Sequence, residues 1–184
     1  MVRRIFLAAV FAFAAAVALY WWLTAPSLAL AVTEPAHVPN LANGQTIFDI
    51  GGCASCHAVP DQPERTRLGG GLAIKSPFGT FYAPNISSDP TDGIGRWREA
   101  DFVNALTRGI SPAGTHYFPA FPYVSYAHAK VDDVRDLFAY LKTLPAVSGK
   151  VRDHDLPFPF NIRRNVGIWK LLFMDETPFV PDPA

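Results

Sequence analysis

The stretch Gly51-Gly52-Cys53-Ala54-Ser55-Cys56-His57 decides how the rest of this 184-residue chain is interpreted. It contains the pattern C-x-x-C-H, which is the attachment site of a c-type haem. Cys53 and Cys56 stand three positions apart, a spacing that lets two thiols reach the two vinyl groups on one porphyrin edge. His57 follows directly and would supply an imidazole nitrogen to the iron as the proximal ligand. The motif therefore predicts one covalently bound haem c.

Two other uses of paired cysteines fit the sequence less well. A thioredoxin-like dithiol follows a β-strand, and the residues before Cys53 do not indicate one. A zinc site needs two further ligands, and the chain holds only two cysteines in all, so it has no second pair. Haem attachment would also keep the two cysteines from pairing with each other if the domain is exported, as the N-terminal segment described below predicts.

The composition excludes two classes of protein. The chain carries 16 basic and 16 acidic side chains, and this zero balance argues against a nucleic acid as partner. Two cysteines are too few for a disulfide framework. The 13 Gly, 17 Pro and 14 Phe indicate a loop-rich domain with an aromatic core. The length predicts one domain with an appendage.

The appendage is the N-terminal segment. Residues 5–23 contain no charged side chain, and two arginines precede them. About 20 helical residues cross the ~30 Å hydrocarbon core of a bilayer, while residues 20–22 (Tyr-Trp-Trp) are typical of a membrane interface. We therefore predict that residues 1–32 are a transmembrane anchor in a bacterial inner membrane, with the following domain in the periplasm. The alternative is a signal peptide, because residues 29–31 (Ala-Leu-Ala) offer a cleavage site.

Apolar periodicity predicts an all-α fold for the remaining chain. We expect a main domain over residues 33–150 and a C-terminal strap over 151–184 that packs on the domain or extends from it. Apolar residues at helical spacing predict helices over residues 41–50, 98–108, 132–144 and 166–172. Residues 58–95 show neither helical spacing nor β-alternation. Such a long loop makes sense if it packs on something other than protein.

Several stretches resemble class I cytochromes c. Residues 43–48 before the motif and residues 137–141 are similar to the two crossing helices of that fold. Other segments are similar to the first haem domain of the cytochrome c subunits of periplasmic quinoprotein or molybdenum alcohol and aldehyde dehydrogenases. These segments are RLGGG (67–71), SPFGTFY (76–82), PNI (84–86), GIGRW (93–97), FPAFPY (118–123) and LPFPFNIR (156–163).

The resemblance implies a class I cytochrome c fold, in which few helices and long loops surround one covalent haem. It also implies an electron carrier rather than an enzyme. Its partners would be a periplasmic dehydrogenase, which donates electrons, and a downstream acceptor toward the respiratory chain. The inner membrane would hold the protein, and no nucleic acid would be bound.

The sequence departs from this family in two places. Relatives continue past a Pro-Asp-Pro linker into further C-x-x-C-H domains, whereas this chain stops at residues 181–184 (Pro-Asp-Pro-Ala). We therefore expect a single-haem protein, or a split or truncated piece of a multihaem subunit. Relatives also carry a methionine ligand of the iron at one of two positions, which are occupied here by Phe121 and Ala129.

Two residues could replace that methionine as the distal ligand. His128 lies beside one vacated position, and Met174 could reach the iron if the strap folds back. Without either ligand the distal site is open, and the alternative function is a gas-binding or peroxidase-like haem protein. We expect His116 to bond loop backbone or a haem propionate, and we expect His37 and His154 to be solvated.

Overall fold

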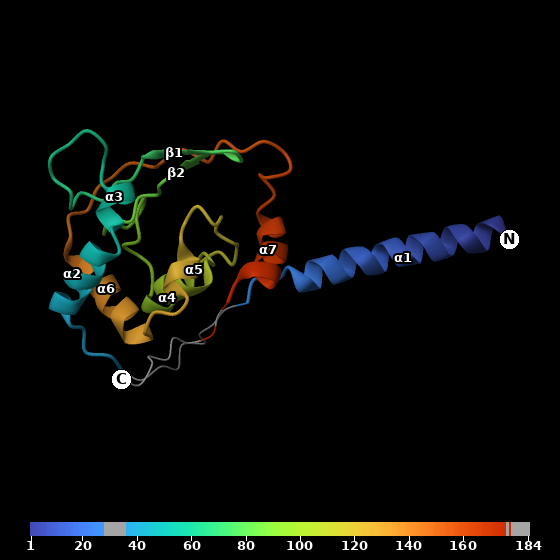
Figure 1. Cartoon of the computed structure of the whole chain (residues 1–184), viewed down its shortest axis with the longest axis horizontal. Helices are drawn as coiled ribbons and strands as arrows, with labels where there is room; N and C mark the ends of the chain where they lie inside the picture. The colour runs from blue at the N-terminus through green and yellow to red at the C-terminus, as the bar shows by residue number, and fades with distance from the viewer. Residues whose placement is uncertain (28–35, 176, 178–184) are drawn as a thin grey trace.

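A computed structural model describes residues 1–27, 36–175 and 177 of the chain. Helix α1 (Val2–Leu23) extends away from a domain of short helices and loops (Figure 1). The other elements are α2 (Leu41–Ile50), α3 (Cys53–His57), β1 (Ala73–Ser76), β2 (Gly79–Tyr82), α4 (Glu99–Arg108), α5 (Tyr123–Tyr126), α6 (Val131–Thr143), the 3-10 turn η1 (Arg163–Asn165) and α7 (Val166–Phe173). Few helices and long loops confirm the predicted fold class.

Helices α2 and α6 cross in close contact, as the resemblance implied. Gly44 of α2 lies directly against the backbone of Asp136 in α6, and a Cβ atom at this glycine would collide with the Asp136 carbonyl. Phe48 and Tyr140 pack beside this contact, with ring centroids 5.5 Å apart. A residue without a side chain therefore lets the two helices approach closely.

Polar contacts fasten the N-terminal end of α2 to α6. Asn40 caps α2 by accepting a hydrogen bond from the Asn43 amide at 3.1 Å. The buried carboxylate of Asp136 accepts bonds from the Asn40 amide at 2.8 Å and the Asn43 side chain at 2.9 Å. His37 lies 2.6 Å from the same carboxylate, and its side chain is only 15% exposed. The expectation of a solvated His37 is thus wrong, because its partner lies 99 positions away in sequence.

The predicted loop over residues 58–95 contains a β-hairpin that the sequence did not indicate. Strands β1 and β2 are antiparallel, with Ala73 opposite Tyr82 and Ser76 opposite Gly79. Each strand has four residues, which is too short for alternation to stand out. The Ser76 hydroxyl closes the turn by bonding the Gly79 carbonyl at 2.9 Å, and the positive φ of 117° at Gly79 favours glycine.

The predicted helices differ from the observed ones only at their ends. Helix α4 starts one residue late, because the Asp101 carboxylate accepts a hydrogen bond from the Arg98 amide at 3.0 Å, and it ends at Arg108, just before Gly109. Helix α6 starts and ends one residue earlier than expected, and α7 ends one residue later. The predicted cleavage site (29–31), the boundary at residue 32 and the terminal residues 181–184 lie outside the described residues.

Candidate haem-binding site

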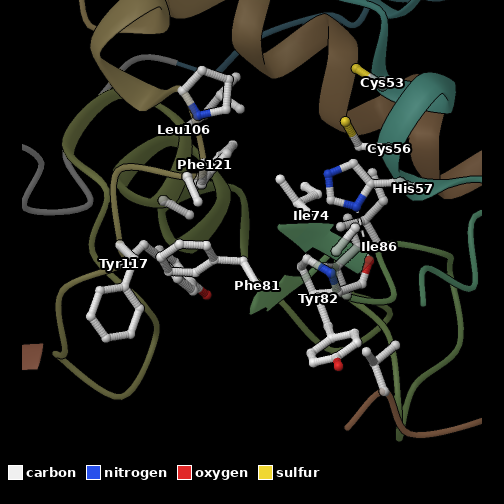
Figure 2. Close-up of a pocket in the computed structure, with 18 of the residues that line it drawn as sticks. Cys53, Cys56, His57, Ile74, Phe81, Tyr82, Ile86, Leu106, Tyr117 and Phe121 are labelled. Carbon is white, nitrogen blue, oxygen red and sulfur yellow. Dashed lines mark hydrogen bonds between the residues drawn. The ribbon is translucent and has the colours of Figure 1, made fainter. Parts of the chain in front are cut away.

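A largely apolar cavity of about 340 Å³ opens between α3, the hairpin and the loop that leads into α5. Figure 2 shows Cys53, Cys56 and His57 on one side of it. Apolar and aromatic side chains on the opposite side include Phe81, Leu106, Tyr117 and Phe121 (Figure 2). The long loop therefore packs around a hollow, with Ile74 of β1 and Phe81 of β2 in its wall.

The short helix α3 brings both thiols to the cavity edge. It begins after Gly52, whose positive φ of 61° is a conformation that glycine adopts without strain. Tyr126 donates a hydrogen bond to the Gly51 carbonyl at 3.1 Å and so ties this turn to α5. Both cysteines are free, and burial raises the pKa of the Cys53 thiol to about 11. Both cysteines line the same rim of the cavity.

His57 presents a neutral imidazole to the cavity. Its Nδ1 lies 2.8 Å from the Pro84 carbonyl oxygen, which can only accept, so Nδ1 carries the proton. Burial lowers the pKa of His57, although the bond to Pro84 opposes this shift. The other ring nitrogen, Nε2, therefore keeps a free lone pair. A ring nitrogen whose tautomer is set by a backbone carbonyl is ready to bind a metal.

Basic side chains from the strap line another part of the cavity. Arg152 lies over the Tyr82 ring at 4.7 Å, and Arg163 lies over the Phe118 ring at 4.7 Å. His154 lies between them in sequence, and its Nδ1 accepts a hydrogen bond from the Tyr82 amide at 3.1 Å. The expectation of a solvated His154 is therefore wrong. The sequence analysis did not place Arg152 or His154 at the haem site. In this part of the chain, it found a resemblance to relatives only in residues 156–163, which end at Arg163.

These groups fit a covalently attached haem. The apolar walls suit the porphyrin, the two thiols suit its vinyl groups, and the free Nε2 of His57 suits the iron. Two arginines at the same cavity would match the negative charge of the propionates. One cavity thus brings together apolar walls, two thiols, a neutral imidazole and two arginines.

The structure does not bring the two distal-ligand candidates to this cavity. The Nδ1 atom of His128 hydrogen-bonds the Thr177 carbonyl oxygen. Met174 lies beside His116 in a second cavity of about 360 Å³ between the end of α1 and α7. Among the described residues that line the haem cavity there is no methionine, and Phe121 lies on the side opposite His57 (Figure 2).

The comparison with protein families agrees with this geometry. Residues 41–145 match the family model of cytochrome c, which covers more than half of the chain. The chain belongs to the cytochrome c family. Cytochromes c carry electrons and do not themselves transform a substrate, so the expectation of an electron carrier rather than an enzyme is confirmed.

Relatives confirm the resemblance to cytochrome c subunits of dehydrogenases. A diheme cytochrome c-type protein of Cereibacter sphaeroides is 48% identical over 153 residues, covering 82% of this chain and 52% of the relative. The fructose dehydrogenase cytochrome subunit of Gluconobacter japonicus is 38% identical over 156 residues (82% and 32%). The alcohol dehydrogenase (quinone) cytochrome c subunit of Gluconobacter oxydans is 34% identical over 161 residues (86% and 33%). This cytochrome c thus spans about half the length of the first relative and about a third of the other two.

Proposed function

We propose that the chain is a membrane-anchored periplasmic cytochrome c with one haem, which passes electrons from a dehydrogenase toward the respiratory chain. The observation that carries the proposal is the convergence of Cys53, Cys56 and His57 on one apolar cavity. When bound, the haem supplies a one-electron couple between ferric and ferrous iron. The sequence has one C-x-x-C-H motif, which supports one haem per chain.

The chain's own residues hold and orient that group. Cys53 and Cys56 would hold the haem through thioether bonds at the cavity rim, and His57 would bind its iron through Nε2. The Pro84 carbonyl fixes the plane and tautomer of the imidazole at 2.8 Å. Ser55, between the cysteines, is exposed, so a haem held by these cysteines would have its thioether edge near solvent. That edge is where a partner's redox group would approach most closely.

The relatives support a dehydrogenase as the electron donor. Several of them are named as cytochrome subunits of dehydrogenases for fructose, alcohols and gluconate. The substrates of those enzymes differ, and the shared part is the cytochrome. We therefore propose a dehydrogenase as partner without assigning its substrate.

The N-terminal helix supports membrane anchoring. Among the described residues, α1 alone is long and apolar enough to cross a membrane, with a mean hydropathy of 2.1 over an 18-residue stretch. Its 22 residues would extend about 33 Å at 1.5 Å per residue. None of them is buried against the domain. Arginines before the apolar run would stay in the cytoplasm and place the haem domain in the periplasm.

Covalent attachment is tested by expressing the chain in cells competent for cytochrome c maturation. We expect the denatured protein to keep its colour and to show the mass of the polypeptide plus one haem. The double variant Cys53→Ser/Cys56→Ser should lose the haem to acid–acetone extraction, while Ser55→Ala should keep it. A colourless wild-type polypeptide after extraction would contradict haem attachment.

Anchoring is tested by fractionation of the same cells. The protein should remain with the membranes through a carbonate wash and should retain Met1 or Val2 at its N-terminus. A soluble periplasmic product that begins near Val32 would show that the segment is a signal peptide only. This outcome would leave the electron-transfer function in place.

A gas-binding function is the second candidate, and one observation favours it. Phe121 lines the cavity at a position where the resemblance implies a methionine ligand. An aromatic ring cannot bind iron, so a sixth coordination position without a protein ligand would accept a small diatomic molecule. Carbon monoxide binding by the reduced protein is the corresponding test.

A further inference from the structure

The end of α1 is fastened to the haem domain by buried polar contacts. Thr24, directly after the helix, is fully buried. Its hydroxyl accepts a hydrogen bond from Arg164 Nε at 2.8 Å, and its carbonyl oxygen lies 2.9 Å from His116 Nε2. Tyr20 also donates a bond to the side chain of Asn165 at 2.8 Å. These bonds fix the direction of α1 relative to the domain.

Helix α7 lies directly against the end of α1. A Cβ atom at Gly167 would come within 2.8 Å of the Cα of Thr24, so the two backbones touch. Figure 1 shows α7 running across the end of α1 rather than continuing its direction. If α1 crosses a bilayer, α7 therefore lies at the surface of that bilayer and along it.

The side of the domain from which α1 leaves carries exposed apolar side chains. We call these residues the docking face: Phe78, Phe158, Phe160, Ile162, Ile168, Leu171, Leu172 and Phe173. Leu172 is 69% exposed and Phe158 is 79% exposed. Phe78 at the hairpin turn packs on Phe160, with ring centroids 5.0 Å apart, so the turn and the strap form one surface. The hairpin turn, the strap and α7 follow one another along this side (Figure 1).

The same segment lacks the acidic side chains that anionic headgroups would repel. Residues 156–174 contain no acidic side chain and three basic ones, Arg163, Arg164 and Lys170. The domain itself engages these three cations, because Arg163 lines the haem cavity, Arg164 bonds Thr24, and Lys170 donates to the carbonyls of Arg108 and Gly109. The exposed apolar area, free of acidic groups, is therefore what suits a membrane interface. Two further aromatic residues, Trp21 and Trp22, are exposed at the adjoining end of α1.

We propose that the docking face rests on the phospholipid bilayer, in the same membrane that α1 crosses. This inference rests on the proposed anchoring by α1. The occupant is lipid because the face is continuous with the end of a membrane-length helix and lacks acidic groups. Arg163 lines the haem cavity and begins η1, the turn that leads directly into α7, so docking sets the orientation of that cavity above the membrane.

Spin labels on the full-length protein with its haem test the proposal. The holoprotein is reconstituted into vesicles of phosphatidylethanolamine and phosphatidylglycerol, and vesicle-bound protein is isolated by flotation. One variant, Leu172→Cys, carries the label on the docking face. The matched control, Ile50→Cys, carries it at the end of α2, where Ile50 is also apolar and 74% exposed but lies far from α1 (Figure 1). Haem attachment consumes the native cysteines, so each label reports one position.

For each label we measure how readily it is reached by oxygen, which dissolves in lipid, and by a nickel complex, which stays in water. We expect the ratio of oxygen access to nickel access to be several-fold higher at residue 172 than at residue 50. Equal, water-like ratios at both positions in floated protein would overturn the docking and leave anchoring intact. A label at residue 172 that neither reagent reaches would show a protein surface, such as a second copy, in place of lipid. Protein that fails to float would overturn anchoring, and docking with it.

Discussion

The Nδ1 atom of His57 donates a hydrogen bond to the carbonyl oxygen of Pro84 at 2.8 Å, across 27 positions of sequence. The loop before Pro84 maintains this contact. The Gly70 amide bonds the His57 carbonyl at 2.8 Å, and Gly70 has a positive φ of 71°. A Cβ atom at Gly70 would collide with the carbonyls of Ala83 and Pro84. The orientation of the candidate iron ligand thus depends on a glycine in the long loop.

This relationship predicts the effect of Gly70→Ala. The added methyl should push Pro84 away from His57 and lower the free energy of unfolding by about 1–3 kcal/mol, because strain and overpacking add. We also expect the electron paramagnetic resonance signal of the ferric haem to shift, since the imidazole plane is released. The matched control is Gly71→Ala, where φ is also positive at 101° but the nearest atom lies 3.8 Å from the added carbon. Equal effects of both substitutions would contradict the role of Pro84.

Phe121 offers a test of the sixth iron position. Phe121→Met should return a thioether to the cavity, raise the reduction potential and slow carbon monoxide binding, because the axial ligand is a main determinant of haem chemistry. A methionine–iron charge-transfer band should appear in the variant and be absent from the wild type. Phe121→Leu, which adds no ligand, is the control and should keep rapid carbon monoxide binding.

Spectra of the haem-loaded wild type also test whether His128 or Met174 is the distal ligand. A wild-type methionine band that Met174→Ala abolishes would show that Met174 reaches the iron. Low-spin bis-imidazole signals that His128→Ala converts to high spin would show the same of His128. Either result would contradict the absence of these residues from the cavity wall.

Asp136 should make the stability of the protein depend on pH. Burial raises the pKa of this carboxyl, but bonds from Asn40, Asn43 and His37 outweigh burial, so its pKa lies below the ordinary value. A depressed pKa in the folded state stabilises the protein above the ordinary pKa of about 4 and loses that effect as the pH falls through the folded value. Asp136→Asn should therefore cost about 1–3 kcal/mol near neutral pH.

Thermal unfolding of the wild type and Asp136→Asn between neutral pH and about pH 3 measures this effect. The difference between their melting temperatures should be largest near neutral pH and should shrink below about pH 4. A matched control is Asp49→Asn, an exposed carboxyl on α2. A difference that stays constant across the range would show that the charge of Asp136 has no part in stability.

Gly44 should be intolerant of a side chain for a steric reason. Gly44→Ala places a methyl against the Asp136 carbonyl and the Tyr140 side chain, which forces α2 and α6 apart. Alanine is the better helix former, yet overpacking should lower the free energy of unfolding by about 1–3 kcal/mol. Gln45→Ala, on the exposed side of the same helix, should change stability by less than about 0.5 kcal/mol. Chemical denaturation of both variants measures the difference, and an unchanged Gly44→Ala would rule out the tight crossing.

The sequence alone was enough for the features that short stretches encode. The C-x-x-C-H spacing indicated Cys53, Cys56 and His57 because attachment to one porphyrin edge needs neighbouring residues. Apolar spacing located α2, α4 and α6 to within a residue, since a helix buries one face every 3.6 residues. The segments resembling cytochrome c subunits pointed to the family that the comparison then confirmed.

Tertiary structure decided which distant residues meet. His37 bonds Asp136 from 99 positions away, His116 bonds the carbonyl of Thr24 at the end of α1, and His154 turns toward the cavity. The residues next to these histidines in sequence do not distinguish them from His128. The ring of His128 bonds the Thr177 carbonyl instead of approaching the haem cavity. A polar side chain takes whichever partner the folded backbone brings within about 3 Å, and chain closure over many residues sets that choice. Local sequence determines where the haem is attached, and the packing of remote segments determines what surrounds it.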